Sequence, residues 1–356
     1  MGLTEMMDAG EHVPTPRRRR RWLGCLPLVL LLVAGVLVGL YLSGHQSLLP
    51  VTEGCVASTP DGIVDLDVNQ MENAGTITAV SVSRNLPEYA ATVALATAMQ
   101  ESKLVNLSGG DLDSVGLFQQ RPSEGWGAAS LIEDPVYATD KFLDRLVAVP
   151  GYAELPLTVA AQDVQHSGYP DAYAQHESDA KVLSGALSGR IPAGVTCQVN
   201  SVGSASSALD GAAAAMNRLT KEFGQTVQPR MLPSGTGTAS GTASASSSGT
   251  GAGTASASPG AATDAQVTVT TRAGLTGTAQ RDWAVAAWAV AHCQDLHISA
   301  VRYAGKEWTA ADSTAGWQPI PAGGSSAGGD SASGSSAGGS SADSSAKQVL
   351  LTVSAE

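Results

Sequence analysis

Glu101 is the residue whose type and position point most clearly to chemistry. It lies near the end of Ala90–Lys103, a segment rich in helix formers. The side chains three, four, seven and eight positions before it are Ala98, Thr97, Ala94 and Val93. A carboxyl on such an apolar face is poorly solvated, which favours its protonated form. A carboxyl that keeps its proton is a general acid for breaking an acetal bond. The alternative is an ordinary glutamate near a helix C-terminus, although an acid there faces an unfavourable helix dipole.

The residues around Glu101 form a pattern in two parts. Glu101 and Ser102 end the predicted helix, and Gly116-Leu117-Phe118-Gln119 begins fifteen residues after Glu101. This pattern resembles that of the lysozyme-like lytic transglycosylases and goose-type lysozymes, which commonly show Glu-Ser followed by Gly-Leu-Met-Gln. The resemblance covers about residues 60–190, and its specific part is confined to 94–127. The longer sequence from Gly116 to Gly127 looks closer to a branch of exported actinobacterial proteins. Some relatives in that branch carry a heavy-metal transporter label.

The resemblance implies a substrate and a set of site residues. It implies that Glu101 is the catalytic acid, that Gln119 contacts the sugar, and that Ser102 and Gln120 belong to the substrate-binding segments. The implied substrate is a peptidoglycan glycan strand, cut at the β-1,4 bond between N-acetylmuramic acid and N-acetylglucosamine without a cofactor. One departure concerns a later helix, where the family usually has Ala-Ala-Tyr-Asn-Ala-Gly. The matching stretch here lacks the Tyr and Asn, and Gln162 or Gln165 could bond to an acetamido group instead.

Asp113 is the candidate for a second catalytic carboxylate. It begins Asp113–Gln119, which reads as a short strand. Two carboxyl groups about 6.5–9.5 Å apart suit an inverting hydrolase, in which the second one activates water. The alternative is a turn aspartate, since Gly109 and Gly110 come shortly before it. Without a second carboxylate, the acetamido group of the sugar could assist and yield an anhydro product, so hydrolysis and transglycosylation both stay open.

Two further residues near the motif have competing interpretations. Trp126 lies between Gly125 and Gly127, and an aromatic ring on such a loop could stack on a sugar face or fold back onto its own core. Arg121 could bind a sugar or a carboxylate of the glycan, and it could equally form a salt bridge with Glu124.

Metal and nucleic-acid functions find little support in the sequence. The six histidines are not accompanied by any Cys-x₂₋₄-Cys pair. One apolar segment without a polar face cannot form a translocation path, so we reject metal transport and expect no metal site. The net charge of −12 also argues against a nucleic-acid partner.

The N-terminal sequence predicts a membrane anchor. Five consecutive arginines, Arg17–Arg21, precede Trp22–Leu42, which holds 21 residues without a charge. Such a helix would be about 30 Å long, the apolar thickness of a bilayer. Basic residues stay cytoplasmic, so we expect a single-pass protein of the cell membrane, in contact with the lipid bilayer through 22–42 and with its body outside the cytoplasm. A cleaved signal peptide is the alternative, but the run is long and no Ala-x-Ala site follows it.

The cysteines agree with an extracytoplasmic body. Cys55 and Cys197 bracket the segment with most helical patterning, and Cys25 lies within the apolar run. A disulfide between Cys55 and Cys197 would stabilise the fold by about 5 kcal/mol in the chain-entropy model. Disulfides persist outside the cytoplasm. Cys293 is expected to be a small buried residue rather than a reactive thiol.

The expected fold is mostly α: a lysozyme-like helical domain with a short β-hairpin, a small C-terminal α/β domain on a disordered linker, and one N-terminal transmembrane helix. The boundaries are a cytoplasmic stub (1–21), the span (22–42), a stalk (43–54), the lysozyme-like domain (55–197), a linker containing one helix (198–263) and the accessory domain (264–356) with a disordered insertion (322–346). The C-terminal block resembles a module found in exported actinobacterial wall-processing proteins, and Trp283 and Trp288 in it read as core.

The sequence thus predicts a membrane-anchored enzyme that cleaves peptidoglycan. The rival interpretation, from another class, is a non-catalytic protein that binds the wall or acts as a scaffold on the same fold, because fold alone does not fix function.

Overall fold

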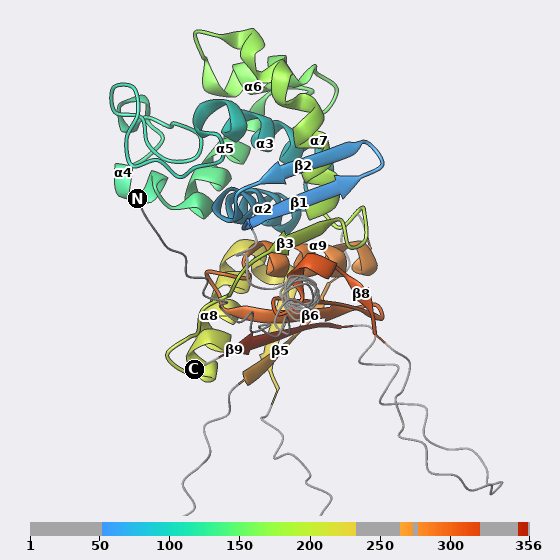
Figure 1. Ribbon diagram of the computed structural model, residues 1–356. Helices are drawn as coiled ribbons and strands as arrows, with labels where there is room; N and C mark the ends of the chain where they lie inside the picture. Colours follow the sequence, from blue (N-terminus) through green and yellow to red (C-terminus); the bar gives the residue numbers. More distant parts are fainter. Residues whose placement is uncertain (1–51, 233–263, 273–276, 321–347, 355–356) are drawn as a thin grey trace, which may run out of the picture. The chain divides into compact units, whose positions relative to one another are not determined.

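The computed structural model describes residues 52–232, 264–272, 277–320 and 348–354. These residues form a mixed α/β structure with eight α-helices and two antiparallel sheets, of three and six strands (Figure 1). The expectation of a mostly α fold is therefore met only in part, because the C-terminal region builds a larger sheet than the sequence analysis foresaw.

The first half of the described chain contains six α-helices. They are α2 (Val68–Ser83), α3 (Glu88–Ser102), α4 (Ala129–Ile132), α5 (Pro135–Ala148), α6 (Leu157–Gln165) and α7 (Glu177–Leu187), with the 3₁₀ segments η1 (Pro122–Glu124) and η2 (Pro170–His176). The small sheet consists of β1 (Gly54–Thr59), β2 (Gly62–Leu66) and β3 (Val195–Gln198), in the order β2-β1-β3.

Local sequence signals explain where several of these helices begin and end. Asp134 caps α5 by accepting a hydrogen bond of 3.1 Å from the Val136 N–H, and Pro135 occupies the first helical position. The last turn of α3 is followed by Lys103 and Leu104, both with left-handed backbone angles. Since that conformation ends a helix, Glu101 is fixed in the final turn of α3.

The second half of the described chain forms the six-stranded sheet and two helices. Its elements are α8 (Ala208–Phe223), η3 (Gly224–Thr226), β4 (Val227–Met231), β5 (Asp264–Thr271), α9 (Thr278–Ala291), β6 (Ile298–Tyr303), β7 (Lys306–Thr309), η4 (Ser313–Ala315), β8 (Gln318–Pro319) and β9 (Val349–Ser354). The strand order is β4-β5-β9-β6-β7-β8. The segment 198–263, predicted as a linker with one helix, holds α8 and also β4, which was not expected.

One face of this sheet is apolar and packs on α8 and α9 (Figure 1). Along β5 and β9 the buried residues alternate with partly exposed ones, as in Val267, Val269, Leu351 and Val353. Such alternation is typical of an antiparallel sheet with one covered face. Trp283 and Trp288 of α9 are also buried, which confirms their assignment to the core.

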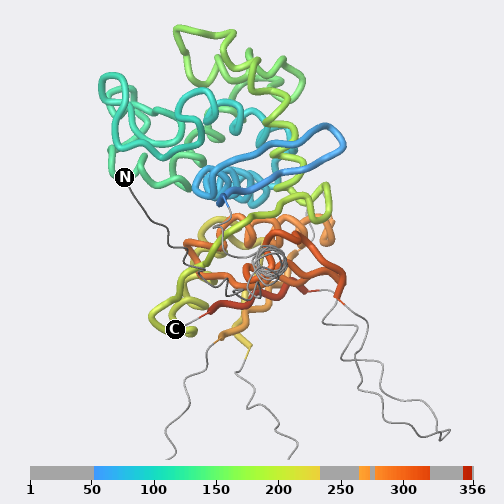
Figure 2. The backbone as a smooth tube through the Cα atoms, in the orientation of Figure 1, coloured from blue at the N-terminus to red at the C-terminus, as the bar shows by residue number. Residues whose placement is uncertain are grey.

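The hydrophobic core crosses the predicted boundary at Cys197. Helix α2 contacts α3, α5 and α7 and also α8 and α9. The approach is close at Gly75, where an added Cβ would lie 3.2 Å from His292 Cε1. The buried side chains of both halves belong to one cluster, and Figure 2 traces the chain as it passes from the helical part to the sheet.

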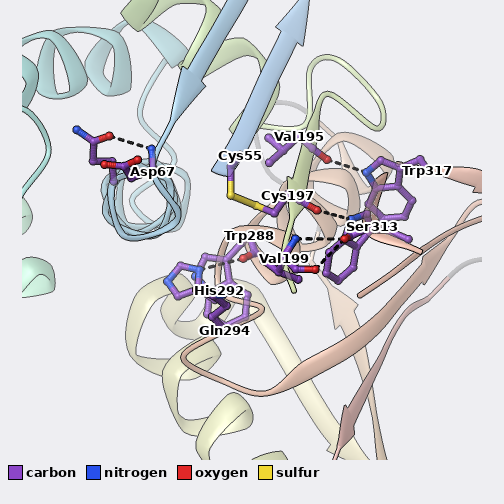
Figure 3. Close-up of a disulfide and its surroundings, with 12 residues drawn as sticks. Cys55, Asp67, Val195, Cys197, Val199, Trp288, His292, Gln294, Ser313 and Trp317 are labelled. Carbon is purple, nitrogen blue, oxygen red and sulfur yellow. Dashed lines mark hydrogen bonds between the residues drawn. A yellow bond between two sulfur atoms is a disulfide. The ribbon is translucent and has the colours of Figure 1, made fainter. Parts of the chain in front are cut away.

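The predicted disulfide between Cys55 and Cys197 is confirmed, and it lies where the two halves meet (Figure 3). The two cysteines are direct partners in the β1–β3 ladder and are buried. The other edge of β3 accepts hydrogen bonds from the C-terminal half: Trp308 Nε1 donates to Cys197 O (3.2 Å) and Trp317 Nε1 to Val195 O (2.8 Å). The bridge therefore fixes the strand on which the C-terminal half docks. Cys293 is free and buried, as expected.

Some predictions were wrong or fall outside the described residues. The predicted strand Asp113–Gln119 is a loop with one isolated bridge, Val115 to Gln120, because Gly116 and Gln119 have positive φ angles. The predicted span 22–42, the stub before it and the tract 322–346 lie outside the described ranges. Among the helices inside those ranges, none is long and apolar enough to cross a membrane.

Candidate active site

Glu101 is half-buried in the last turn of α3. Its Oε1 accepts a hydrogen bond of 2.7 Å from the Tyr173 hydroxyl. Within the described part of the chain its Oε2 accepts no hydrogen bond, so this is the oxygen that could carry a proton for transfer. The carboxyl is thus held in one orientation rather than pointing freely into solvent.

Tyr173 is the functional candidate that the sequence analysis missed. It is fully buried in η2, and burial, followed by the adjacent Glu101 charge, raises the pKa of its phenol well above the ordinary value. The phenol therefore stays protonated and donates to Glu101. The available signal was Pro170, which predicts a helical start and places Tyr173 one turn later, but nothing local joins that turn to Glu101.

The two parts of the motif are in direct contact. The Ser102 hydroxyl, which is buried, donates to Leu117 O at 2.7 Å and also lies 3.0 Å from Ala98 O. Gly116 has a φ of +78°, and an added Cβ would lie 2.7 Å from Ile132 O, so only glycine fits there. Ser102 therefore joins α3 to the loop that begins at Gly116, and it acts inside the protein rather than at a surface.

The four glutamines predicted to bind substrate all use their amide nitrogens inside the protein. Gln119 Nε2 donates to Gly116 O (3.1 Å), and Gln120 Nε2 donates to Ala138 O (3.0 Å). Gln162 Nε2 donates to Ser167 O (2.9 Å), and Gln165 Nε2 donates to Phe118 O (2.8 Å). Gln120 is buried, whereas Gln119 is partly exposed. The bond from Gln165 ties α6 to the loop of the motif, so these side chains fix the loops around Glu101.

Asp113 is the centre of a different arrangement. Its carboxylate accepts hydrogen bonds from Arg121 Nε (2.9 Å), the Ser123 N–H (2.8 Å) and the Ser123 hydroxyl (3.0 Å). The Arg121 hydrogen bond, followed by that of the Ser123 N–H, lowers the pKa of Asp113 to about 2. Arg121 also bonds to Glu124 at 2.6 Å. Of the two roles considered for Arg121, the structure thus contains the salt bridge with Glu124. A carboxylate so well satisfied is a poor base near neutral pH.

Trp126 lies in the core. It is 4% exposed, and the Arg145 guanidinium lies 3.4 Å from the centroid of its ring. Its carbonyl accepts a hydrogen bond of 3.1 Å from the Tyr137 hydroxyl. Of the two interpretations of Trp126, this placement favours the packing role over sugar stacking, because the ring face is already occupied.

Neither a metal centre nor a known family offers a second route to the function. Among the residues that the structure describes, no three His, Cys, Asp or Glu side chains are arranged to hold a metal ion. No protein-family model matches the sequence, and a search of curated proteins finds no match either. The features that point to a function are therefore the residues of the motif around Glu101 and their geometry.

Proposed function

We propose that this chain cleaves peptidoglycan at the β-1,4 bond between N-acetylmuramic acid and N-acetylglucosamine, with Glu101 as the acid. The observation that carries this proposal is the bond from the buried Tyr173 phenol to Glu101 Oε1, 2.7 Å long. It orients a half-buried carboxyl at the end of an apolar helix and leaves one oxygen for proton transfer. A positioned acid of this kind is what acetal cleavage requires.

The proposed reaction uses one carboxyl group twice. Glu101 Oε2 gives its proton to O4 of the departing N-acetylglucosamine while the bond from that oxygen to C1 of N-acetylmuramic acid breaks. The acetamido oxygen of the muramic acid stabilises the positive charge at C1. The C6 hydroxyl of the same sugar then bonds to C1, and its proton returns to the Glu101 carboxylate. The products are an anhydro sugar end and a free hydroxyl, so the proposed activity is lytic transglycosylation.

The ion pair of Asp113 supports this outcome over hydrolysis by an inverting muramidase. We expect that Asp113→Asn lowers the rate of glycan release no more than about tenfold, through loosening of the loop that Arg121 and Ser123 hold, because a carboxylate with so low a pKa is not the base that activates water. The rate of release from purified peptidoglycan measures this effect. A loss as large as that caused by Glu101→Gln would instead make Asp113 a second catalytic carboxylate.

Tyr173 is proposed to position the acid. We expect that Tyr173→Phe lowers kcat by about tenfold and leaves KM nearly unchanged, because it removes one hydrogen bond to a charged group and no contact with substrate. Initial rates of glycan release over a range of substrate concentrations separate kcat from KM. A change in KM alone, or an unchanged kcat, would contradict the positioning role.

The proposed location is outside the cytoplasm, on the membrane. The disulfide supports an oxidising compartment, and the arginine-flanked apolar run 22–42 supports an anchor with its N-terminus in the cytoplasm. Protease treatment of intact cells is expected to remove the body and spare the arginine-rich tip. An inaccessible body would overturn this topology.

The second candidate function is a wall-binding or scaffold protein without catalysis. It is favoured by the four glutamines, whose amide nitrogens bond to backbone carbonyls and so hold loops in place instead of facing a sugar. Binding of the full chain to insoluble peptidoglycan, with no soluble glycan released, would support this candidate over the enzyme.

A further inference from the structure

Tyr169 is a large aromatic side chain left exposed next to η2, the segment that carries Tyr173. It is 78% exposed, more than any other large hydrophobic side chain in the described ranges. It directly precedes Pro170, the first residue of η2, and the same short segment carries Tyr173. Four residues of a 3₁₀ segment rise about 8 Å, so the two tyrosines are near neighbours although one is buried and the other exposed.

The backbone at Tyr169 is held in place by Ser167. The Tyr169 N–H donates to Ser167 Oγ at 3.2 Å, and Gln162 Nε2 donates to Ser167 O at 2.9 Å. Ser167 therefore fixes the backbone of the loop that presents Tyr169 and joins this loop to α6.

The far end of η2 is attached to α3 as well. Gln175 Nε2 donates to Gln100 Oε1 at 2.9 Å, and His176 Nε2 lies 3.1 Å from the same oxygen. Gln100 directly precedes Glu101. Because η2 is bonded to the last turn of α3 at Tyr173 and again at its C-terminal end, η2 is fixed relative to the acid, and Tyr169 directly precedes it.

We propose that Tyr169 is a stacking platform for a sugar ring of the glycan next to the bond that Glu101 cleaves, an inference that rests on the proposed function. An exposed aromatic ring on a fixed backbone offers an apolar face to the C–H groups of a pyranose at little entropic cost, and its hydroxyl end stays in water. The ring is open to a ligand, since Tyr169 is 78% exposed. Single exposed apolar residues are common on protein surfaces, but this one directly precedes the segment whose Tyr173 bonds to the candidate acid.

The test uses the full chain carrying Glu101→Gln, which removes cleavage, and measures its affinity for the hexasaccharide of N-acetylglucosamine by calorimetry. On that background Tyr169→Ala is expected to weaken binding about tenfold, and Tyr169→Phe no more than about twofold, because the ring carries the contact. The matched control is Leu209→Ala on α8, which removes another exposed apolar side chain and is expected to leave the affinity unchanged. Equal melting temperatures of the variants would show that all of them fold.

The outcomes separate this inference from the function on which it rests. Binding by the parent that Tyr169→Ala leaves unchanged, or that Tyr169→Phe weakens as much as Tyr169→Ala, would overturn the stacking platform and leave the proposed function standing. A parent that does not bind the oligosaccharide at all would overturn both.

Discussion

Replacing Glu101 by Gln is expected to lower the rate of glycan release from purified peptidoglycan by about 10²–10⁴-fold, the contribution typical of a general acid. The change is nearly isosteric, and the amide oxygen can still accept the hydrogen bond from Tyr173. It removes only the proton that the departing O4 would receive. The loss should therefore appear in kcat, with substrate affinity largely kept.

The matched control for this experiment is Glu154→Gln, which changes an exposed glutamate in the loop before α6. It is expected to release glycan at the rate of the unchanged protein. All variants should be full chains, because α2 packs against α8 and α9 and a fragment ending at Cys197 would expose that surface. Equal release by the Glu101→Gln variant and the unchanged protein would contradict the assignment of the acid.

The second large effect is expected on stability, from replacing Glu222, a residue with no role in the proposed reaction. This carboxylate is buried on α8 between α2 and α9. Its Oε2 accepts a hydrogen bond of 2.6 Å from Trp288 Nε1, and its Oε1 accepts from Thr76 Oγ1 at 3.1 Å and from Arg218 Nε. His292 Nε2 lies 3.6 Å away. The group thus joins helices from both halves of the described chain.

We expect that Glu222→Gln lowers the free energy of unfolding by about 3–5 kcal/mol, because removing one member of a buried ion pair leaves the other charges uncompensated. Denaturant unfolding of the full chain measures the change. The control is Glu307→Gln, whose pair with Arg302 is partly exposed and should cost less than about 1 kcal/mol. A Glu222 variant as stable as this control would show that the cluster does not hold the halves together.

The same cluster predicts how stability depends on pH. Burial alone would raise the pKa of Glu222, but His292 and Arg218 outweigh it and hold that pKa below its usual value. For His292, burial lowers the pKa, and the Glu222 charge more than reverses this, so the net shift is upward. Burial raises the pKa of Asp295 to about 6, with Glu72 and Glu222 also raising it and His292 and Arg218 opposing.

The signs of these shifts define the pH range in which the fold is most stable. The stabilisation from Glu222 is present above its unfolded pKa of about 4.3 and is lost as the pH falls; that from His292 is present below about 6.5 and is lost as the pH rises through its higher folded pKa. The destabilisation from Asp295 develops as the pH rises from its unfolded pKa of about 3.9 to its folded pKa of about 6. The protein should therefore melt at a higher temperature near pH 5.5 than near pH 8, and Glu222→Gln should reduce this difference.

Much of the local structure could be predicted from the sequence. Helix α5 begins at Asp134 and Pro135 because both signals act within one turn. In strands β5 and β9 of the six-stranded sheet, apolar residues recur at every second position, because one face of the sheet is covered. The pairing of β1 with β3 depends on residues 142 positions apart, and neither short strand carries a local pattern strong enough to predict it.

The candidate site was predictable in its residues and less so in their arrangement. Glu101, Ser102 and the loop from Gly116 do come together, because Ser102 binds the carbonyl of Leu117. The sequence could not show that Tyr173 reaches Glu101, nor that Arg145 covers the ring of Trp126. Both contacts join segments that are distant in the sequence, and the sequence next to Tyr173 or Arg145 carries no pattern that indicates the contact.

Mass analysis of the soluble fragments released from purified peptidoglycan tests the central claim most directly. The full chain is expected to release fragments that end in an anhydro form of N-acetylmuramic acid, one water lighter than the hydrolysis product, and the Glu101→Gln variant is expected to release none. No glycan fragments from the unchanged protein, or the same fragments in the same amount from the variant, would contradict the assignment of Glu101 as the acid that breaks the bond.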